Sequence, residues 1–257
     1  MDILRLAYFQ MDIVWEAPQE NLLQIKKVLE QHHKEMDMLV LPEMCLTGFT
    51  MSPSAIAEPW PNGVNLKRLK EFSLSYDVVL VGSLAVEEDG LYYNRGFVFE
   101  RGEVIHVYDK RHLFSLASEG QWYTRGTEKS VFQFKGWSLN LAICYDLRFP
   151  VWLRNTEDYD LLIIVANWPE KRVEAWNALL KARAIENMTY VLGVNRVGTD
   201  ANGIVYSGES VCFDPLGGMR SQQGSRLQIM ELSKKELLQK RNRLGFLKDQ
   251  DDFEIIF

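Results

Sequence analysis

Hydrophobic positions along the chain follow two patterns, short continuous apolar runs and longer segments with helical spacing. The apolar runs predict strands over residues 3–9, 37–44, 78–86, 137–144, 160–166 and 189–197. The helical spacing predicts helices over residues 18–34, 65–76, 149–158, 172–188 and 232–243. Strands that alternate with helices in this way are typical of an α/β fold.

Two segments depart from this strict alternation. Residues 91–110 predict two strands joined by a tight turn near Glu100-Arg101-Gly102, and residues 214–217 predict a further turn in hairpin-like material. Because strand pairs joined by hairpins favour two packed sheets with helices outside, we expect a four-layer α-β-β-α sandwich. A single doubly wound sheet is the alternative. We expect residues 1–257 to form one domain, with a C-terminal tail from about residue 245, because no linker or repeat divides the chain.

Composition narrows the class of protein. The chain has 257 residues, 47% of them hydrophobic, which is enough to bury a large core. Its formal net charge is −6 and no basic cluster follows a helix, so a nucleic-acid partner is not expected. No apolar run approaches the roughly 18 residues of a membrane span. There is no secretory signal at the start of the sequence, so we expect a cytoplasmic protein without a membrane partner.

The three cysteines, Cys45, Cys144 and Cys212, are odd in number and widely spaced. Reduced thiols fit this pattern better than a disulfide framework. The sequence has no CxxC pair and no histidine-rich cluster, and therefore predicts no metal site. Cys45 and Cys212 are interpreted as packing residues. Cys144 differs, because an apolar strand stops there and polar residues follow.

Three predicted strands end in a side chain capable of chemistry, at Glu43, Lys110 and Cys144. Ligands gather where strand ends and their loops converge, so these three groups would form a nucleophilic site if they met. A helix predicted to begin just after Cys144, and a nearby cation, would stabilise its thiolate. Glu43 could accept the thiol proton, while Lys110 and the backbone N–H of Tyr145 could hold a developing oxyanion.

Each of these residues also has a structural interpretation when it is taken alone. A cysteine at the end of an apolar run is most often a small buried hydrophobic residue. Glu43 could cap a helix, and Lys110 could be a solvated surface charge.

Three local motifs carry a resemblance to a known family. They are LPEMCLTGF (41–49), YDKRHLF (108–114) and ICYDLRFP (143–150). In this order they resemble the glutamate, lysine and cysteine motifs of the nitrilase superfamily of carbon–nitrogen hydrolases. The resemblance implies an α-β-β-α sandwich that forms a homodimer across a helical face and needs no metal or organic cofactor. Trp152 and Trp176, on predicted helices, are compatible with such a face.

The resemblance also implies roles for individual residues. Glu43 would be the general base, Lys110 the oxyanion stabiliser, and Cys144 the nucleophile that forms a thioester. Glu119 matches a second glutamate of the family in the loop after the lysine. Its implied role is to position Lys110 and the substrate ammonia.

Within the superfamily, the chain is most similar to bacterial omega-amidases. The segments that carry this similarity are CYDLRFPVW (144–152), ANWP (166–169) and KDQDDF (248–253). The similarity implies hydrolysis of the terminal amide of small 2-oxo acid monoamides, such as 2-oxoglutaramate to 2-oxoglutarate and ammonia.

Such a substrate has a carboxylate that needs a cation in the binding site. Arg148 and Arg172 are the candidates, although Arg148 could instead form an ion pair with Asp146 or Asp160. Tyr145 and Trp168 could form walls of the pocket, or they could be core aromatic residues.

Other functions stay open on the sequence alone. The chain could be another hydrolase of the superfamily, acting on deaminated glutathione, a carbamoyl amine or a nitrile. A catalytically silent interaction module would be expected to have lost the glutamate, lysine or cysteine, and all three are present. A Cys–His hydrolase would need a histidine near Cys144, and His112 is the best candidate of the four in the chain.

Overall fold

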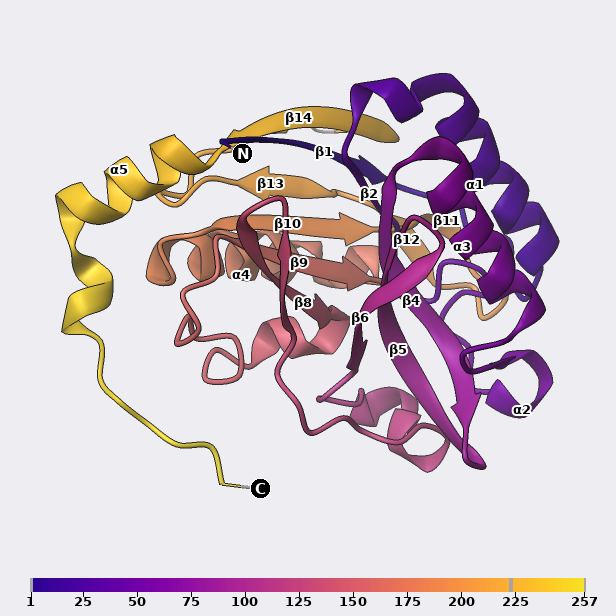
Figure 1. The fold of residues 1–257 in the computed structure, drawn as a ribbon. Coiled ribbons are helices and arrows are strands. Elements are labelled where there is room, and N and C mark those ends of the chain that lie inside the picture. Colours follow the sequence, from indigo (N-terminus) through magenta and orange to yellow (C-terminus); the bar gives the residue numbers. More distant parts are fainter. Residues whose placement is uncertain (1, 222–223, 257) are drawn as a thin grey trace.

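Two β-sheets pack against each other, and helices cover their outer faces (Figure 1). The computed structural model describes residues 2–221 and 224–256. It has the predicted four-layer α-β-β-α architecture, so the alternative of one doubly wound sheet is wrong. Within the described part of the chain, no helix is long and apolar enough to cross a membrane.

Each sheet mixes strands from distant parts of the sequence. The first sheet contains β1 (Ile3–Phe9), β2 (Met38–Val40), β3 (Glu58–Pro59), β4 (Val79–Glu88), β5 (Leu91–Glu100), β6 (Glu103–Asp109) and β14 (Leu227–Ser233). Its order is β14-β1-β2-β4-β5-β6, with β3 beside β4. The second sheet contains β7 (Val131–Phe134), β8 (Trp137–Ile143), β9 (Leu161–Ala166), β10 (Tyr190–Asn195) and β13 (Val211–Phe213), in the order β13-β10-β9-β8-β7. A separate hairpin pairs β11 (Val197–Thr199) with β12 (Val205–Ser207).

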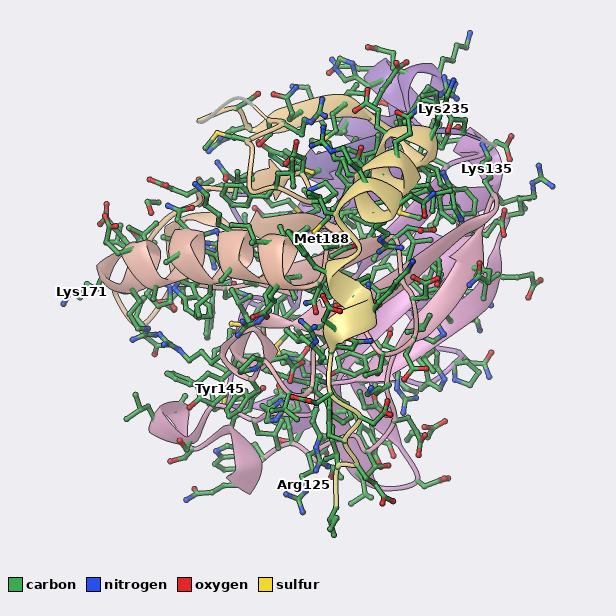
Figure 2. The ribbon with its side chains drawn as sticks, turned by 90° about the vertical axis from the view of Figure 1, so that its left-hand side faces the viewer. Arg125, Lys135, Tyr145, Lys171, Met188 and Lys235 are labelled. Carbon is green, nitrogen blue, oxygen red and sulfur yellow. The ribbon has the colours of Figure 1, made fainter. Side chains whose placement is uncertain are left out.

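The α-helices are α1 (Pro18–His32), α2 (Pro53–Ile56), α3 (Val64–Tyr76), α4 (Val173–Glu186) and α5 (Lys234–Leu244). The 3-10 helices are η1 (His33–Glu35), η2 (Ser115–Ala117), η3 (Glu119–Gln121), η4 (Cys144–Arg148), η5 (Glu170–Arg172) and η6 (Phe246–Asp249). Apolar side chains of α1 and α3 pack on the first sheet, and those of α4 pack on the second. Figure 2 shows α4 with Lys171 near one end, and α5 leading into the C-terminal tail.

The alternation of side chains along the strands explains the layers. In β1, Leu4, Leu6 and Tyr8 pack in the core between the two sheets, whereas Ala7 and Phe9 pack beneath the helices. Because successive side chains of a strand point to opposite faces, a strand covered on both faces reads as a continuous apolar run. This is why the apolar runs identified the strands correctly.

The prediction of a helix over residues 149–158 is wrong. The segment is a turn-rich loop that contains no helix. Its backbone is held by side-chain hydrogen bonds instead: Asn155 accepts one from the Tyr159 N–H at 2.8 Å and donates one to the Tyr159 carbonyl at 3.0 Å. Asparagine competes in this way with helical backbone hydrogen bonds.

One further interpretation needs correction, and one strand was not predicted. Trp152 and Trp176 are 5% and 0% exposed and belong to the core, so neither forms part of an exposed dimer face. The edge strand β7 was not predicted; it pairs antiparallel with β8.

Candidate active site

The structure brings the ends of three separate strands together. Glu43 lies just past β2, Lys110 directly follows β6, and Cys144 directly follows β8. The Nζ atom of Lys110 lies 2.8 Å from Oε1 of Glu43, and both side chains are fully buried. The interpretation of Lys110 as a solvated surface charge is therefore wrong. Cys144 is partly exposed, and Glu43 and Lys110 both act on the pKa of its thiol.

Hydrogen bonds fix the carboxylate of Glu43 on both sides. Its Oε1 atom accepts from Lys110 Nζ and from Asn94 Nδ2, each at 2.8 Å. Its Oε2 atom accepts from the backbone N–H of Asn167 at 2.8 Å. A buried carboxylate with several donors is held in one orientation, as a general base requires.

Glu119 also accepts hydrogen bonds from the Nζ atom of Lys110. Both carboxylate oxygens of Glu119 lie 3.0 Å from Lys110 Nζ, and the Phe114 N–H donates to Oε2 at 2.6 Å. Burial acts to lower the pKa of Lys110, but the charges of Glu119 and Glu43 outweigh it and raise the pKa above its ordinary value. Lys110 is therefore an ammonium ion at neutral pH. Burial also raises the pKa of Glu119, against the opposing effect of Lys110.

The local backbone at Cys144 differs from the prediction. The backbone of Cys144 has a φ of +48°, a left-handed conformation that residues other than glycine rarely adopt. Cys144 begins the five-residue 3-10 helix η4. No α-helix begins near it to stabilise a thiolate. Such backbone strain often marks a functional position.

The pKa of the Cys144 thiol is shifted in the direction opposite to the prediction. Burial raises this pKa well above its ordinary value, the charge of Glu43 raises it further, and Lys110 opposes both. At neutral pH the group is therefore a thiol. It can attack only if a neighbouring base takes its proton, and Glu43 is adjacent.

His112 is oriented away from the role of a general base. Its ring Nδ1 lies 2.8 Å from Oδ1 of Asp146, and its ring stacks on Phe149 with 3.7 Å between centroids. This arrangement gives the Cys–His alternative no support.

A cavity of about 430 Å³ opens beside Cys144. All four predicted substrate-binding residues line it, namely Tyr145, Arg148, Trp168 and Arg172. The expected alternative for Arg148, an ion pair with Asp146 or Asp160, is wrong. Asp146 accepts hydrogen bonds from other groups, and Asp160 pairs with Lys234 and Arg241.

The two arginines of the cavity rest on aromatic rings. The Arg148 guanidinium lies 5.0 Å from the centroid of the Trp168 ring, and that of Arg172 lies 5.3 Å from the ring of Phe114. Among the described residues, neither arginine forms a salt bridge with an acidic side chain. Both charges therefore stay available to an anionic group in the cavity.

The sequence analysis missed two residues that hold Glu43. Asn167 directly follows β9, so the same strand-end reasoning that found Cys144 could have found it. Asn94 lies within β5, and no sequence signal distinguishes it from other strand residues.

The chain is similar to known proteins over nearly its whole length. A family model described as "Carbon-nitrogen hydrolase" matches residues 5–231. The protein named Omega-amidase YafV from Yersinia enterocolitica is 41% identical over 100% of both chains. The 2-oxoglutaramate amidase of Bacillus subtilis is 32% identical, over 85% of this chain and 86% of that one. The crystal structure of XC1258 from Xanthomonas campestris, described as a CN-hydrolase superfamily protein, superposes with a TM-score of 0.94 at 34% identity, over 99% of this chain and 100% of that one.

Proposed function

Because the chain belongs to the carbon–nitrogen hydrolase family, we propose that it is an omega-amidase that converts 2-oxoglutaramate to 2-oxoglutarate and ammonia. It is a hydrolase of carbon–nitrogen bonds other than peptide bonds. The name of the Bacillus subtilis relative supports the substrate, and that of the Yersinia enterocolitica relative supports the omega-amidase activity. The observation that carries the proposal is the cavity itself, which has a thiol beside a buried carboxylate and two arginines without acidic partners among the described residues. A monoamide of a dicarboxylic acid offers the matching groups.

We assign catalysis to Glu43, Lys110 and Cys144. Glu43 takes the thiol proton while the sulfur of Cys144 forms a bond with the amide carbon. The carbonyl oxygen becomes negative and is stabilised by the Lys110 ammonium and by the backbone N–H of Tyr145. One such donor is typically worth about 10²–10³ in rate. Glu119 keeps Lys110 charged and in place through its two hydrogen bonds.

The tetrahedral intermediate collapses when the carbon–nitrogen bond breaks. Glu43 returns the proton to the nitrogen, so ammonia leaves and a thioester remains on Cys144. Glu43 then takes a proton from water, whose oxygen attacks the thioester carbon. The carbon–sulfur bond breaks and the proton returns to the sulfur, which restores the thiol. No metal or organic cofactor takes part in this scheme.

The other end of the substrate is assigned to the arginines. Arg148 or Arg172 would pair with the carboxylate, and Tyr145 and Trp168 would form apolar walls around the carbon chain. A guanidinium that already rests on an aromatic ring is held in place for such a pair.

The test is turnover by the purified wild-type enzyme. We expect release of ammonia and formation of 2-oxoglutarate from 2-oxoglutaramate, and no release by a folded Cys144→Ala variant. If the wild type instead released ammonia only from deaminated glutathione, a carbamoyl amine or a nitrile, the substrate assignment would be wrong while the hydrolase assignment stood.

We further propose a cytoplasmic homodimer. The described cysteines are all free thiols, in keeping with a reducing compartment. Exposed apolar side chains of Val151, Ile185 and Phe246, near α4 and η6, support a contact between two copies. Sedimentation equilibrium should give the dimer mass, and a monomer at micromolar concentration would contradict this assignment.

A further inference from the structure

In the terminal amide of Asn167, the nitrogen Nδ2 forms hydrogen bonds and the oxygen Oδ1 forms none within the described residues. Its Nδ2 donates to the backbone carbonyl of Glu43 at 2.6 Å and lies 3.4 Å from Glu43 Oε2. Within the described residues, its buried Oδ1 has no hydrogen-bond partner. The residue is 4% exposed, and it lines the cavity that holds Cys144.

The orientation of this amide is set by its neighbours. Both groups near Nδ2 are oxygen atoms of Glu43 that can only accept hydrogen bonds. If the amide were flipped, Oδ1 would face these two acceptors and both hydrogen bonds would be lost. The free atom is therefore the acceptor.

A buried acceptor without a partner costs free energy, and such an exception in a native structure calls for a ligand or a function. The reacting end of a carboxamide has one acceptor oxygen and two N–H donors. The donors of the site, Lys110 and the Tyr145 N–H, suit the carbonyl oxygen. An acceptor is still needed for the amide nitrogen.

The carboxylates in and near the cavity already accept hydrogen bonds from the protein. Glu43 accepts from three groups, as described above. Of the carboxylates that line the cavity, Glu16 accepts from Thr50 Oγ1 at 2.6 Å, and Asp200 accepts from Tyr206, Asn202 and Ile204.

We propose that Oδ1 of Asn167 accepts a hydrogen bond from an N–H of the substrate's carboxamide, and that this contact selects amides over esters of the same acid. The inference rests on the proposed function of the cavity. Asn167 is a neutral acceptor, so it can hold the –NH2 group and the departing ammonia without taking a proton from either. An ester has no N–H and would leave Oδ1 unpaired, and a site built to hydrogen-bond a substrate group discriminates against analogues that lack it.

The test compares 2-oxoglutaramate with the 5-methyl ester of 2-oxoglutarate, because both give the same thioester on Cys144. The measured quantity is the ratio of kcat/KM for the amide to kcat/KM for the ester. Loss of support for Glu43 slows both substrates, and the amide somewhat more, because Glu43 also protonates the leaving nitrogen. Loss of the acceptor slows the amide alone. We therefore expect Asn167→Ala to lower the ratio by about tenfold or more.

Asn94→Ala is the matched control. It also removes a donor to Glu43, but Asn94 is not among the residues that line the cavity. We expect lower activity toward both substrates and a ratio that falls by much less than in Asn167→Ala, so this variant measures the effect of Glu43 alone. If Asn167→Ala behaved in the same way, Asn167 would only support Glu43 and the proposal would be overturned. Circular dichroism checks the fold, and Asn167→Ser provides the same comparison if the alanine variant does not fold.

Failure of the proposed function is a separate outcome. If the wild type does not hydrolyse 2-oxoglutaramate, the substrate assignment fails. The ratio is then measured with whichever amide the wild type does hydrolyse and with its methyl ester, and an unchanged ratio in Asn167→Ala would still reject the role of Oδ1.

Discussion

The carboxylate of Asp146 binds His112 twice, accepting from its backbone N–H at 2.9 Å and from its ring Nδ1 at 2.8 Å. The second oxygen of Asp146 accepts from the Ile143 N–H at 3.0 Å and from the Tyr108 hydroxyl at 2.8 Å. Asp146 therefore connects the end of β8, which carries Cys144, to the loop that carries Lys110. It therefore fixes the position of Cys144 relative to Lys110.

We predict that Asp146→Ala lowers kcat by about a hundredfold and the free energy of unfolding by about 3 kcal/mol, because four donors, two of them buried, lose their acceptor. His112→Ala is the control, since it removes the ring hydrogen bond and keeps the backbone one. It should retain most of the wild-type kcat. Loss of all turnover in His112→Ala, measured by ammonia release, would instead favour the Cys–His mechanism.

The pKa of the Cys144 thiol should fall in a Glu43→Gln variant, although turnover falls as well. Burial is the largest cause of the raised pKa and Glu43 the next, so removing the charge of Glu43 favours the thiolate. The measurement is the pH dependence of thiolate ultraviolet absorbance, with Cys144→Ala as the blank. A pKa that stays the same or rises in Glu43→Gln would show that Glu43 does not act on the thiol.

The arginines of the cavity should affect binding according to the charge of the substrate. We predict that replacing the arginine that binds the carboxylate, either Arg148 or Arg172, by alanine raises KM for 2-oxoglutaramate about ten- to a hundredfold. This factor corresponds to the free energy of a charge-assisted hydrogen bond. Butanamide, which has no carboxylate, serves as the control and should show little change. An equal loss for both amides would place the effect in the fold of the cavity instead.

Asp37 should contribute stability that depends on pH. Burial acts to raise its pKa, but hydrogen bonds from Arg5 and Lys135 outweigh this and lower the pKa from 3.8 to about 2. Since the folded-state pKa is lowered, this stability is fully present above about pH 4 and is lost as the pH falls toward 2. Allowing for solvent screening at the exposed partners, Asp37→Asn should cost about 1–2 kcal/mol at pH 7.

Urea denaturation of the wild type and of Asp37→Asn, at pH 7 and at steps down to pH 2, measures this contribution. The difference between the two proteins should disappear as Asp37 becomes protonated. A difference that persisted unchanged at pH 2 would mean that Asp37 stabilises the fold through its shape, and not through its charge.

The sequence predicted the layers of the fold because buried strands such as β9 are continuous apolar runs that leave little ambiguity. It failed at 149–158, where the side chain of Asn155 replaces helical hydrogen bonds by contacts that spacing does not reveal. The raised pKa of the Cys144 thiol results from burial and from the charge of Glu43, which is distant in the sequence, so it could not be inferred from the cysteine motif. Asn94 supports Glu43 across 51 positions of sequence, a relationship that only the folded chain contains.

The central claim is that Cys144 becomes acylated by the amide substrate. Mass spectrometry of the wild-type enzyme, quenched in acid at successive times during turnover of 2-oxoglutaramate, tests it most directly, because acid stops hydrolysis of the thioester. We predict a covalent acyl adduct on the peptide that contains Cys144, and no adduct when Cys144 is replaced by alanine. An adduct on a different residue, or an unmodified Cys144 at every time while ammonia is released, would contradict the account.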